Sequence, residues 1–306
     1  MLKKFDMDSI FLTITTSMNR FSTSCIKRVK DLMLLIVFSA VALSVQAATY
    51  YSGGSGNPTD KNKWWSNTAG TLLPHPSNFT TAGDVFIVQA THTMSTPANW
   101  TVTGSVIVNG ILSSNKHNFT FGVFTINSGG TVNVNHPFIV NGTTTVSGTI
   151  NFSSDNKTAR LMNFKGDVTL NSGAVWTEPA SGNGANNTYN FAGNFTNNAT
   201  TFTAVGTGLH TFSGTSKTIS GSKITSIPNV AVTGSYTNNG TLTVTTALSG
   251  AGSLTLGTTG ILNIGGTSTI TTLVASAVGN TVNLYRRSAN LKGNHLPQSD
   301  LIRQRG

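Results

Sequence analysis

Charged residues and cysteine are both scarce in this chain. Only 9% of its 306 residues are Asp, Glu, Lys or Arg, which disfavours a helical bundle, because such a bundle needs a charged surface. The single cysteine, Cys25, lies within the first 47 residues. The rest of the chain therefore cannot form a disulfide or a thiolate metal site, and its fold must depend on packing and backbone hydrogen bonds.

The formal net charge of +10 is concentrated at the two ends of the chain. Residues 48–283 contain eight Lys or Arg and five Asp or Glu, which is a balance of only +3. These basic residues are scattered, whereas a nucleic-acid-binding face needs them clustered. We therefore expect no nucleic-acid partner.

The first 47 residues predict an export signal. A basic stretch, residues 27–30, precedes an apolar run, residues 32–45, and the sequence Val-Gln-Ala at 45–47 has the small-x-small pattern of a signal-peptidase site. The run is shorter than the ~20 residues of a membrane-spanning helix, and an uncleaved anchor is the alternative. Met18 is an alternative start that would give a signal of ordinary length. The sequence thus predicts an exported protein, extracellular or on the outer cell surface, with no membrane span in the mature chain.

Thr, Gly, Asn and Ser dominate the composition, with 145 of 306 residues. From residue 84 onward, short runs alternate apolar residues with Thr or Asn and end in a Gly or Asn turn, as in residues 106–110 (VIVNG), 124–130 (FTINSGG) and 168–173 (VTLNSG). Alternation at period two predicts half-buried strands. The Gly and Asn residues between them are expected to supply the positive φ of tight turns.

These runs recur with a loose period near 20 residues. Aligned starts at 106, 124, 145, 168 and 195 are 18 to 27 residues apart, and an intermediate coil near 209–212 fills the larger step to 236. Such a period without helices predicts an all-β fold, a right-handed parallel β-helix over residues 84–283 with two or three strands per coil. Apolar residues would fill its core, and Thr and Asn would form ladders outside. An antiparallel β-sandwich is the alternative.

Residues 48–83 differ from the repeats, because they combine aromatic residues with loop formers and prolines. The first coil of a stack needs a cover, since an open sheet end recruits other chains. We therefore expect residues 48–83 to form an N-terminal aromatic cap. Trp64 and Trp65 could instead form a platform that stacks on sugars, which makes them the weak candidates for ligand binding.

The opening residues 48–53 (ATYYSG), the Trp residues that follow and coils such as residues 124–133 (FTINSGGTVN) carry a family resemblance. The chain resembles the Thr/Gly/Asn-rich surface repeat proteins of gliding-type Gram-negative bacteria, many of which are exported by type IX secretion. The resemblance implies a parallel β-helix that is displayed or released outside the cell as an adhesin or scaffold. Such proteins are usually longer and end in a sorting domain, which is missing in this sequence.

A basic tail, residues 284–306, departs from the repeat. Codons that the genetic code permits for this tail, read one nucleotide later, spell YTGAAQTLKATTYHNLTLSGNG, a phrase expected after GNTVN in such a repeat. We therefore expect a truncated or frameshifted member of the family, and a basic disordered tail is the alternative. An uncovered C-terminal coil is also expected to favour self-association.

Three acidic residues are candidates for catalysis. Asp155, Asp167 and Glu178 could serve a polysaccharide lyase or hydrolase of the β-helix type, since Asp155 and Glu178 are 23 residues, or about one coil, apart. Such an enzyme needs two acids at a defined separation, or several acids around a metal ion. Solvated charges on a wider loop are the simpler interpretation. The histidines are dispersed and none has the spacing of a metal ligand.

The sequence therefore predicts no enzyme, no cofactor and no metal site. It favours an exported, non-catalytic repeat protein whose extended face binds an extracellular polymer, a carbohydrate or another cell-surface component. The alternatives are a carbohydrate-active β-helix enzyme built on the three acids, a carbohydrate-binding module, and an outer-membrane barrel. The barrel is disfavoured because it needs ~10-residue strands and aromatic girdles.

Overall fold

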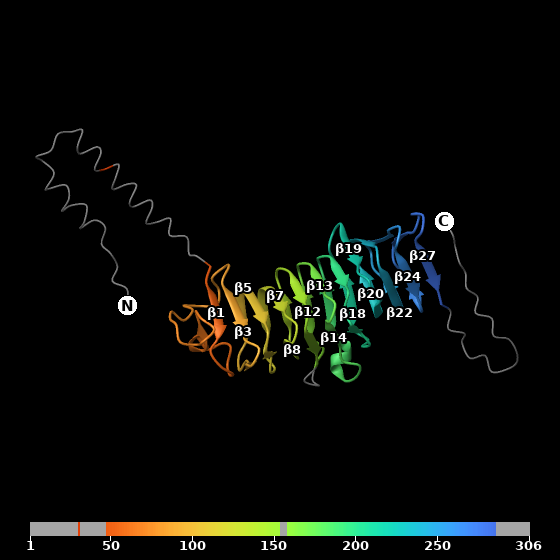
Figure 1. Cartoon of the computed structure of the whole chain (residues 1–306). Coiled ribbons are helices and arrows are strands. Elements are labelled where there is room, and N and C mark those ends of the chain that lie inside the picture. Colours follow the sequence, from red (N-terminus) through yellow and green to blue (C-terminus); the bar gives the residue numbers. More distant parts are fainter. Residues whose placement is uncertain (1–29, 31–46, 154–157, 286–306) are drawn as a thin grey trace, which may run out of the picture. The chain divides into compact units, whose positions relative to one another are not determined.

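The computed structural model describes residues 30, 47–153 and 158–285. From residue 47 onward the described chain is a β-solenoid of about 10 turns, in which short strands stack on the equivalent strands of the previous turn (Figure 1). All strand pairs are parallel except the pair β1–β2. The predicted parallel solenoid is therefore confirmed, and the antiparallel sandwich is wrong.

Each regular turn contributes three strand segments, which stack into three columns. Column A contains β1 (Thr49–Ser52), β3 (Val85–Val88), the second halves of β5 (Trp100–Val108) and β7 (Phe119–Ile126), β10 (Thr144–Val146), β13 (Val168–Leu170), β16 (Phe195–Asn197), β19 (Lys217–Ser220), β21 (Ser235–Asn238), β23 (Ser253–Leu256) and β26 (Thr272–Val274). Column B contains the first halves of β5 and β7, β9 (Phe138–Val140), β12 (Leu161–Phe164), β15 (Thr188–Phe191), β18 (Leu209–Phe212), the second halves of β20 (Thr225–Val232) and β22 (Thr241–Ser249), and β25 (Thr267–Ser268).

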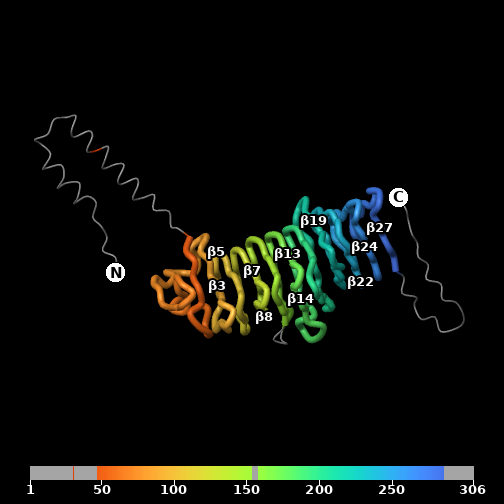
Figure 2. Tube along the Cα trace, viewed as in Figure 1, coloured from red at the N-terminus to blue at the C-terminus, as the bar shows by residue number. Residues whose placement is uncertain are grey.

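Column C is the third wall. It contains the six-stranded sheet β4 (Thr93–Ser95), β6 (Ile111–Ser113), β8 (Thr131–Val134), β11 (Thr149–Phe152), β14 (Val175–Thr177) and β17 (Thr201–Thr203), and then the first halves of β20 and β22, β24 (Ile261–Ile264) and β27 (Thr281–Leu284). The chain runs from A to C to B within a turn, and Figure 2 shows the turns following one another in sequence order. The only helical segments described in this stack are two short 3₁₀ turns, η1 (Lys61–Lys63) and η2 (Asn183–Asn186).

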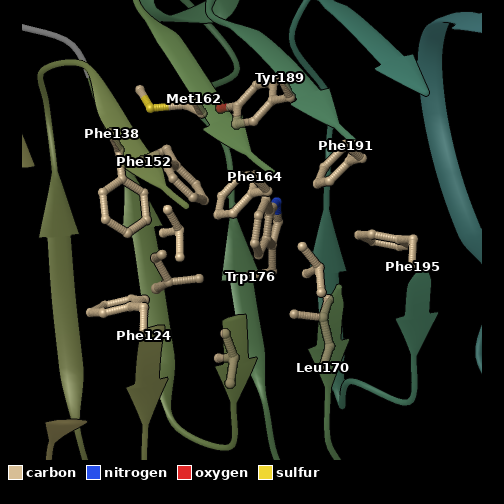
Figure 3. Close-up of a cluster of buried hydrophobic side chains, with 14 of the residues drawn as sticks. Phe124, Phe138, Phe152, Met162, Phe164, Leu170, Trp176, Tyr189, Phe191 and Phe195 are labelled. Carbon is tan, nitrogen blue, oxygen red and sulfur yellow. The ribbon is translucent and has the colours of Figure 1, made fainter. Parts of the chain in front are cut away.

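In most strands, alternate side chains point into the space between the three walls, whereas the last strands, β25 to β27, have no buried residue. In β8 the buried residues are Val132 and Val134, and the outward residues are Thr131 and Asn133. Because equivalent residues of successive turns lie ~4.8 Å apart, large side chains stack along the core. The rings of Phe164 and Phe191, for example, are 5.4 Å apart and inclined by only 8° (Figure 3). The predicted apolar core is confirmed.

Two positions of the predicted repeat are wrong. In column A, Phe124 pairs with Thr144 and not with Thr145, and the column passes through Asn238 rather than Tyr236. Residues 143–145 are three consecutive threonines, so their polarity does not show which one points inward, although period two counted back from Val146 places Thr144 inward. The coil near 209–212 exists, but it is β18 of column B, and the column A strand of that turn is β19.

A row of glycines forms the corner between columns B and A. Their positions are Gly104, Gly122, Gly142, Gly166, Gly193, Gly214, Gly234 and Gly252. None of them has a positive φ, whereas Gly129 and Gly173, at turns where the sequence predicts it, do. Glycine is required here because of close approach: a Cβ on Gly193 would lie 2.3 Å from the carbonyl carbon of Gly166, one turn earlier. Asparagine also differs from the prediction, since Asn115 is the only Asn described with a positive φ.

The first turn is covered by residues 53–83, whereas β1 is already a strand of the stack. β1 pairs with β3 in parallel on one side and with β2 (Trp64–Trp65) antiparallel on the other, so β2 covers the edge of column A. At the other end, β27 continues through Leu284, and the amide of Tyr285 donates to the Ile264 carbonyl at 2.8 Å. The last described strand thus extends slightly beyond the predicted boundary at residue 283.

Candidate functional site

Asp167 lies on the outer face of column A, at the start of β13. Its carboxylate accepts hydrogen bonds from the backbone amide of Asn194 at 2.8 Å and from the side-chain amide of the same residue at 3.0 Å. The bond from the Asn194 backbone is the main reason that the pKa of Asp167 is lowered. Asp167 therefore joins two successive turns through a surface hydrogen bond.

Glu178 lies inside the solenoid. It follows β14, and only 3% of its surface is exposed. Glu178 thus points into the core, whereas Asp167 lies on the outer surface of column A. The structure does not bring these two predicted acids together in one cleft. Asp155, the third candidate, lies outside the described residues. The interpretation of the acids as solvated charges is wrong for Glu178.

The partner of Glu178 is His210, which lies on β18 of the next turn. The Nε2 atom of His210 is 3.0 Å from each carboxylate oxygen of Glu178, and the His210 side chain is also buried. The indole nitrogen of Trp176 donates to the Oε1 atom of Glu178 at 2.8 Å. On the remaining side, the Nδ1 atom of His210 is 3.3 Å from the carbonyl oxygen of Gly208. Sequence reasoning missed this pair, because it takes His210 as one of several dispersed histidines.

Two further polar side chains border the Glu178–His210 pair. The ring of Tyr189 stacks on that of His210, with centroids 4.6 Å apart. Burial raises the pKa of Tyr189 well above its ordinary value, and the nearby Glu178 carboxylate adds to the rise. Asn187 accepts a hydrogen bond from the backbone amide of Arg160 at 2.8 Å. The buried Asn187 side chain interacts with the Tyr189 hydroxyl and opposes part of the rise in the pKa of Tyr189.

A second buried polar group, the Tyr236 hydroxyl, lies beneath the glycine corner. It is 2.8 Å from the carbonyl oxygen of Phe191 and 2.9 Å from that of Gly193, and it accepts a bond from the amide of Gly214 at 3.2 Å. Burial is the largest cause that raises the pKa of Tyr236 to about 12. This hydroxyl therefore supplies hydrogen bonds to backbone groups that lie at the turn between columns.

We expect alkaline pH to destabilise the solenoid, partly through Tyr236. An unfolded tyrosine loses its proton near pH ~10, whereas folded Tyr236 keeps it up to about pH 12. The folded state then binds more protons between these values, so the free energy of unfolding falls as pH rises through this window. Urea unfolding from pH ~8 to ~11 should show a shallower fall for Tyr236→Phe, by up to ~1.4 kcal/mol per pH unit. At neutral pH the variant should be less stable by ~1–3 kcal/mol, because backbone groups lose their partner. An unchanged alkaline slope would contradict this role.

The two adjacent tryptophans of the predicted cap have different environments. Trp64 is completely buried, its indole nitrogen donates to the Pro58 carbonyl at 2.8 Å, and its ring packs on those of Phe86 and Trp100. Trp65 is partly exposed. A sugar-stacking platform made of both rings is therefore not formed, because Trp64 belongs to the core.

Threonine hydroxyls form a continuous row on the outer face of column A. Thr125, Thr145, Thr169, Thr196 and Ser220 occupy the same position of five successive turns. The hydroxyls of Thr196 and Ser220 are 3.1 Å apart, whereas those of the first three threonines make no hydrogen bond within the described part of the chain. We call this row the column A threonine row.

Asparagine ladders occur on the other two walls. The side-chain amide of Asn151 donates to that of Asn133 in column C at 3.1 Å, and Asn190 donates to Asn163 in column B at 2.9 Å. These bonds confirm the predicted ladders of like side chains. They join one turn to the next and leave only part of each amide for an external ligand.

The described residues contain no group of three or more side chains suited to a metal ion. Within the same part of the chain, no helix has the length and apolar character that crossing a membrane requires. A scan against protein-family models gives no match, and neither the curated proteins nor the solved structures that were searched match this chain.

Proposed function

We propose that this chain is an exported, non-catalytic repeat protein that acts as an adhesin or scaffold. In this proposal the outer face of column A binds an extracellular polymer, a carbohydrate or another cell-surface component. The observation that supports it is the column A threonine row, in which neutral hydroxyls recur turn after turn and several have no partner within the fold. The export signal lies outside the described residues and remains a prediction.

The same surface favours a neutral ligand. The row itself contains no charged residue, and the nearest predicted acid, Asp167, already accepts two hydrogen bonds from Asn194. Hydroxyl groups both donate and accept hydrogen bonds, so a row of them can match a polymer that carries hydroxyl groups at regular intervals. A polysaccharide-acting enzyme is the alternative, and it would need acids that converge in a cleft.

Removing three hydroxyls from the row should weaken binding at least about tenfold without unfolding the protein. Thr125, Thr145 and Thr169 are replaced together by Val, which keeps the shape and the strand preference of each residue. We expect retention of the full chain on insoluble cellulose or chitin particles to fall at least about tenfold, because three hydrogen bonds of ~0.5–1.5 kcal/mol each are lost.

The matched control carries the same three changes on another wall. Thr131, Thr149 and Thr201 point outward from column C at one common position, and their replacement by Val should leave retention unchanged. Both variants should unfold within ~0.5 kcal/mol of the parent, as surface substitutions usually do. Equal retention of the two variants, or no retention of the parent on either material, would contradict the proposed binding face.

A further inference from the structure

The buried Glu178–His210 pair lies at the base of the loop that joins β14 to β15. This loop, residues 178–187, begins with Glu178, contains η2 and ends with Asn187. Its beginning is fixed to the next turn, because the amide of Glu178 donates to the Thr203 carbonyl at 2.9 Å. Its far part is also fixed to that turn, since the amide of Gly208 donates to the Ala185 carbonyl at 2.8 Å. The pair and the loop therefore share the same neighbouring segment.

The contacts of the pair determine how many protons it holds. His210 Nδ1 faces the Gly208 carbonyl, and His210 Nε2 faces the Glu178 carboxylate. A carbonyl oxygen only accepts, so the first contact needs a proton on Nδ1. The second contact also needs one, which lies either on Nε2 or on the carboxyl group. The geometry is therefore satisfied when histidine and carboxyl together hold two protons.

Either a gain or a loss of one proton disturbs this arrangement. With one proton fewer, acceptor faces acceptor at one of the two contacts, and an anion remains in the core. With one proton more, a cationic imidazole is buried beside a neutral carboxylic acid. Both states leave an uncompensated charge at a site where the two side chains are only 1% and 2% exposed, which is strongly unfavourable.

We propose that the Glu178–His210 pair is a pH-sensitive latch that keeps the 178–187 loop closed while the pair holds two protons. The loop opens at pH values above and below that range, because the Glu178–His210 pair then carries an uncompensated buried charge. The latch operates whether or not column A binds a polymer, so it goes beyond the adhesive role.

The other groups around the pair do not titrate in the same range. Tyr189 stacks on His210, and its pKa lies well above the ordinary value because of burial, so it stays neutral until strongly alkaline pH. Arg160, on the preceding turn, is connected to the loop through its backbone amide, which donates to the Asn187 side chain. The pair also contacts Trp176 on β14, which donates to Glu178, and Phe191 on β15, whose ring centroid is 6.4 Å from that of His210, and Val230 of β20 pairs with His210.

Hydrogen exchange of the full chain tests the latch directly. The amides of Ala185, Asn187 and Gly208 should be most protected at intermediate pH, after correction for the intrinsic exchange rate. From there, protection should fall at least about tenfold toward both pH ~4 and pH ~9. Glu178→Gln keeps the shape of the side chain, and its amide can donate to Nε2 of a neutral His210 while Nδ1 donates to Gly208. This variant should therefore keep the loop protected toward pH ~9, where the parent loses protection, and still lose protection toward pH ~4, where a cationic imidazole would be buried without a carboxylate. Two controls, Asp167→Asn and His117→Gln, change a carboxylate and a histidine elsewhere and should keep the parent's profile in the loop.

Nitrogen-15 spectra of the imidazole ring in the parent protein give a second readout, which does not depend on any variant folding. At the pH of maximal protection, the Nδ1 atom of His210 should carry a proton and the Nε2 atom should be protonated or strongly hydrogen-bonded. A ring with an unprotonated, unbonded nitrogen at that pH would overturn the proposal. Loop protection that is the same from pH ~4 to pH ~9 in the parent would also overturn it.

Discussion

Gly193→Ala should destabilise the solenoid by about 3 kcal/mol or more, although it adds a single methyl group. The new Cβ would lie 2.3 Å from the carbonyl carbon of Gly166 and 2.4 Å from the amide nitrogen of Asp167. Both atoms belong to the backbone of the previous turn, which cannot rotate away as a side chain would. Relieving the overlap requires the two turns to separate, and this loosens the strand pairs β13–β16 and β12–β15 on either side of the corner. Overpacking of this kind costs ~1–3 kcal/mol even where side chains can yield.

The matched control for this prediction is Gly129→Ala. Gly129 has a φ of 85° and no atom within 4 Å of the added Cβ, so the control measures backbone strain without overlap, at ~1–2 kcal/mol. At Gly193 the φ is not positive, so alanine causes no backbone strain there. By lowering the conformational entropy of the unfolded chain, alanine would even favour folding if the overlap were absent. Urea unfolding followed by tryptophan fluorescence gives both values. A Gly193 variant that is as stable as the Gly129 variant would show that close packing at the corner does not require glycine.

The alternation of residue types was sufficient to predict the strands and their inward faces. In residues 168–170 (VTL), for example, Val168 and Leu170 are buried and Thr169 points outward, as period two requires. The prediction fails where a polar residue occupies an inward position, as in the three threonines at 143–145, among which Thr144 shares the inward face with Val146. There the structure places the Thr144 hydroxyl in the core without a partner, which no polarity pattern would favour.

The contacts between turns were harder to predict than the strands. His210 lies in residues 209–212 (LHTF), where it shares the inward face with Phe212, so alternation alone indicates a buried ring. Its partner could not be identified, because the stacking of Glu178 near His210 depends on how the chain closes a 27-residue turn between Val168 and Phe195. The glycine corner was likewise only partly predictable. The recurrence of glycine is visible in the sequence, whereas its cause, an approach of backbone to backbone, appears only when the turns are stacked.

Trp64→Ala should cost about 3–5 kcal/mol, which is the usual loss for a large buried aromatic residue. The ring of Trp64 lies 5.3 Å from that of Phe86 and 5.6 Å from that of Trp100, so it joins the cap to β3 and β5. Its removal also leaves the Pro58 carbonyl without the hydrogen bond that the indole donates. We expect the first turns to lose protection from hydrogen exchange before the rest, because neighbouring turns of a solenoid stabilise one another only locally.

The adjacent residue provides the control that separates a cap from a sugar platform. Trp65 is partly exposed and packs on the His75 ring at 4.3 Å, so Trp65→Ala should cost only ~1 kcal/mol. Thermal unfolding and the retention on cellulose or chitin are then measured for both variants. A cap predicts that Trp64→Ala lowers stability and Trp65→Ala changes neither quantity strongly. If Trp65→Ala instead abolished retention while stability stayed the same, ligand binding would lie on the N-terminal segment and not on the column A threonine row. The two neighbouring substitutions therefore decide whether the ligand binds to the N-terminal segment or to the column A threonine row, because Trp64 is buried in the core and only Trp65 is exposed enough to contact a ligand.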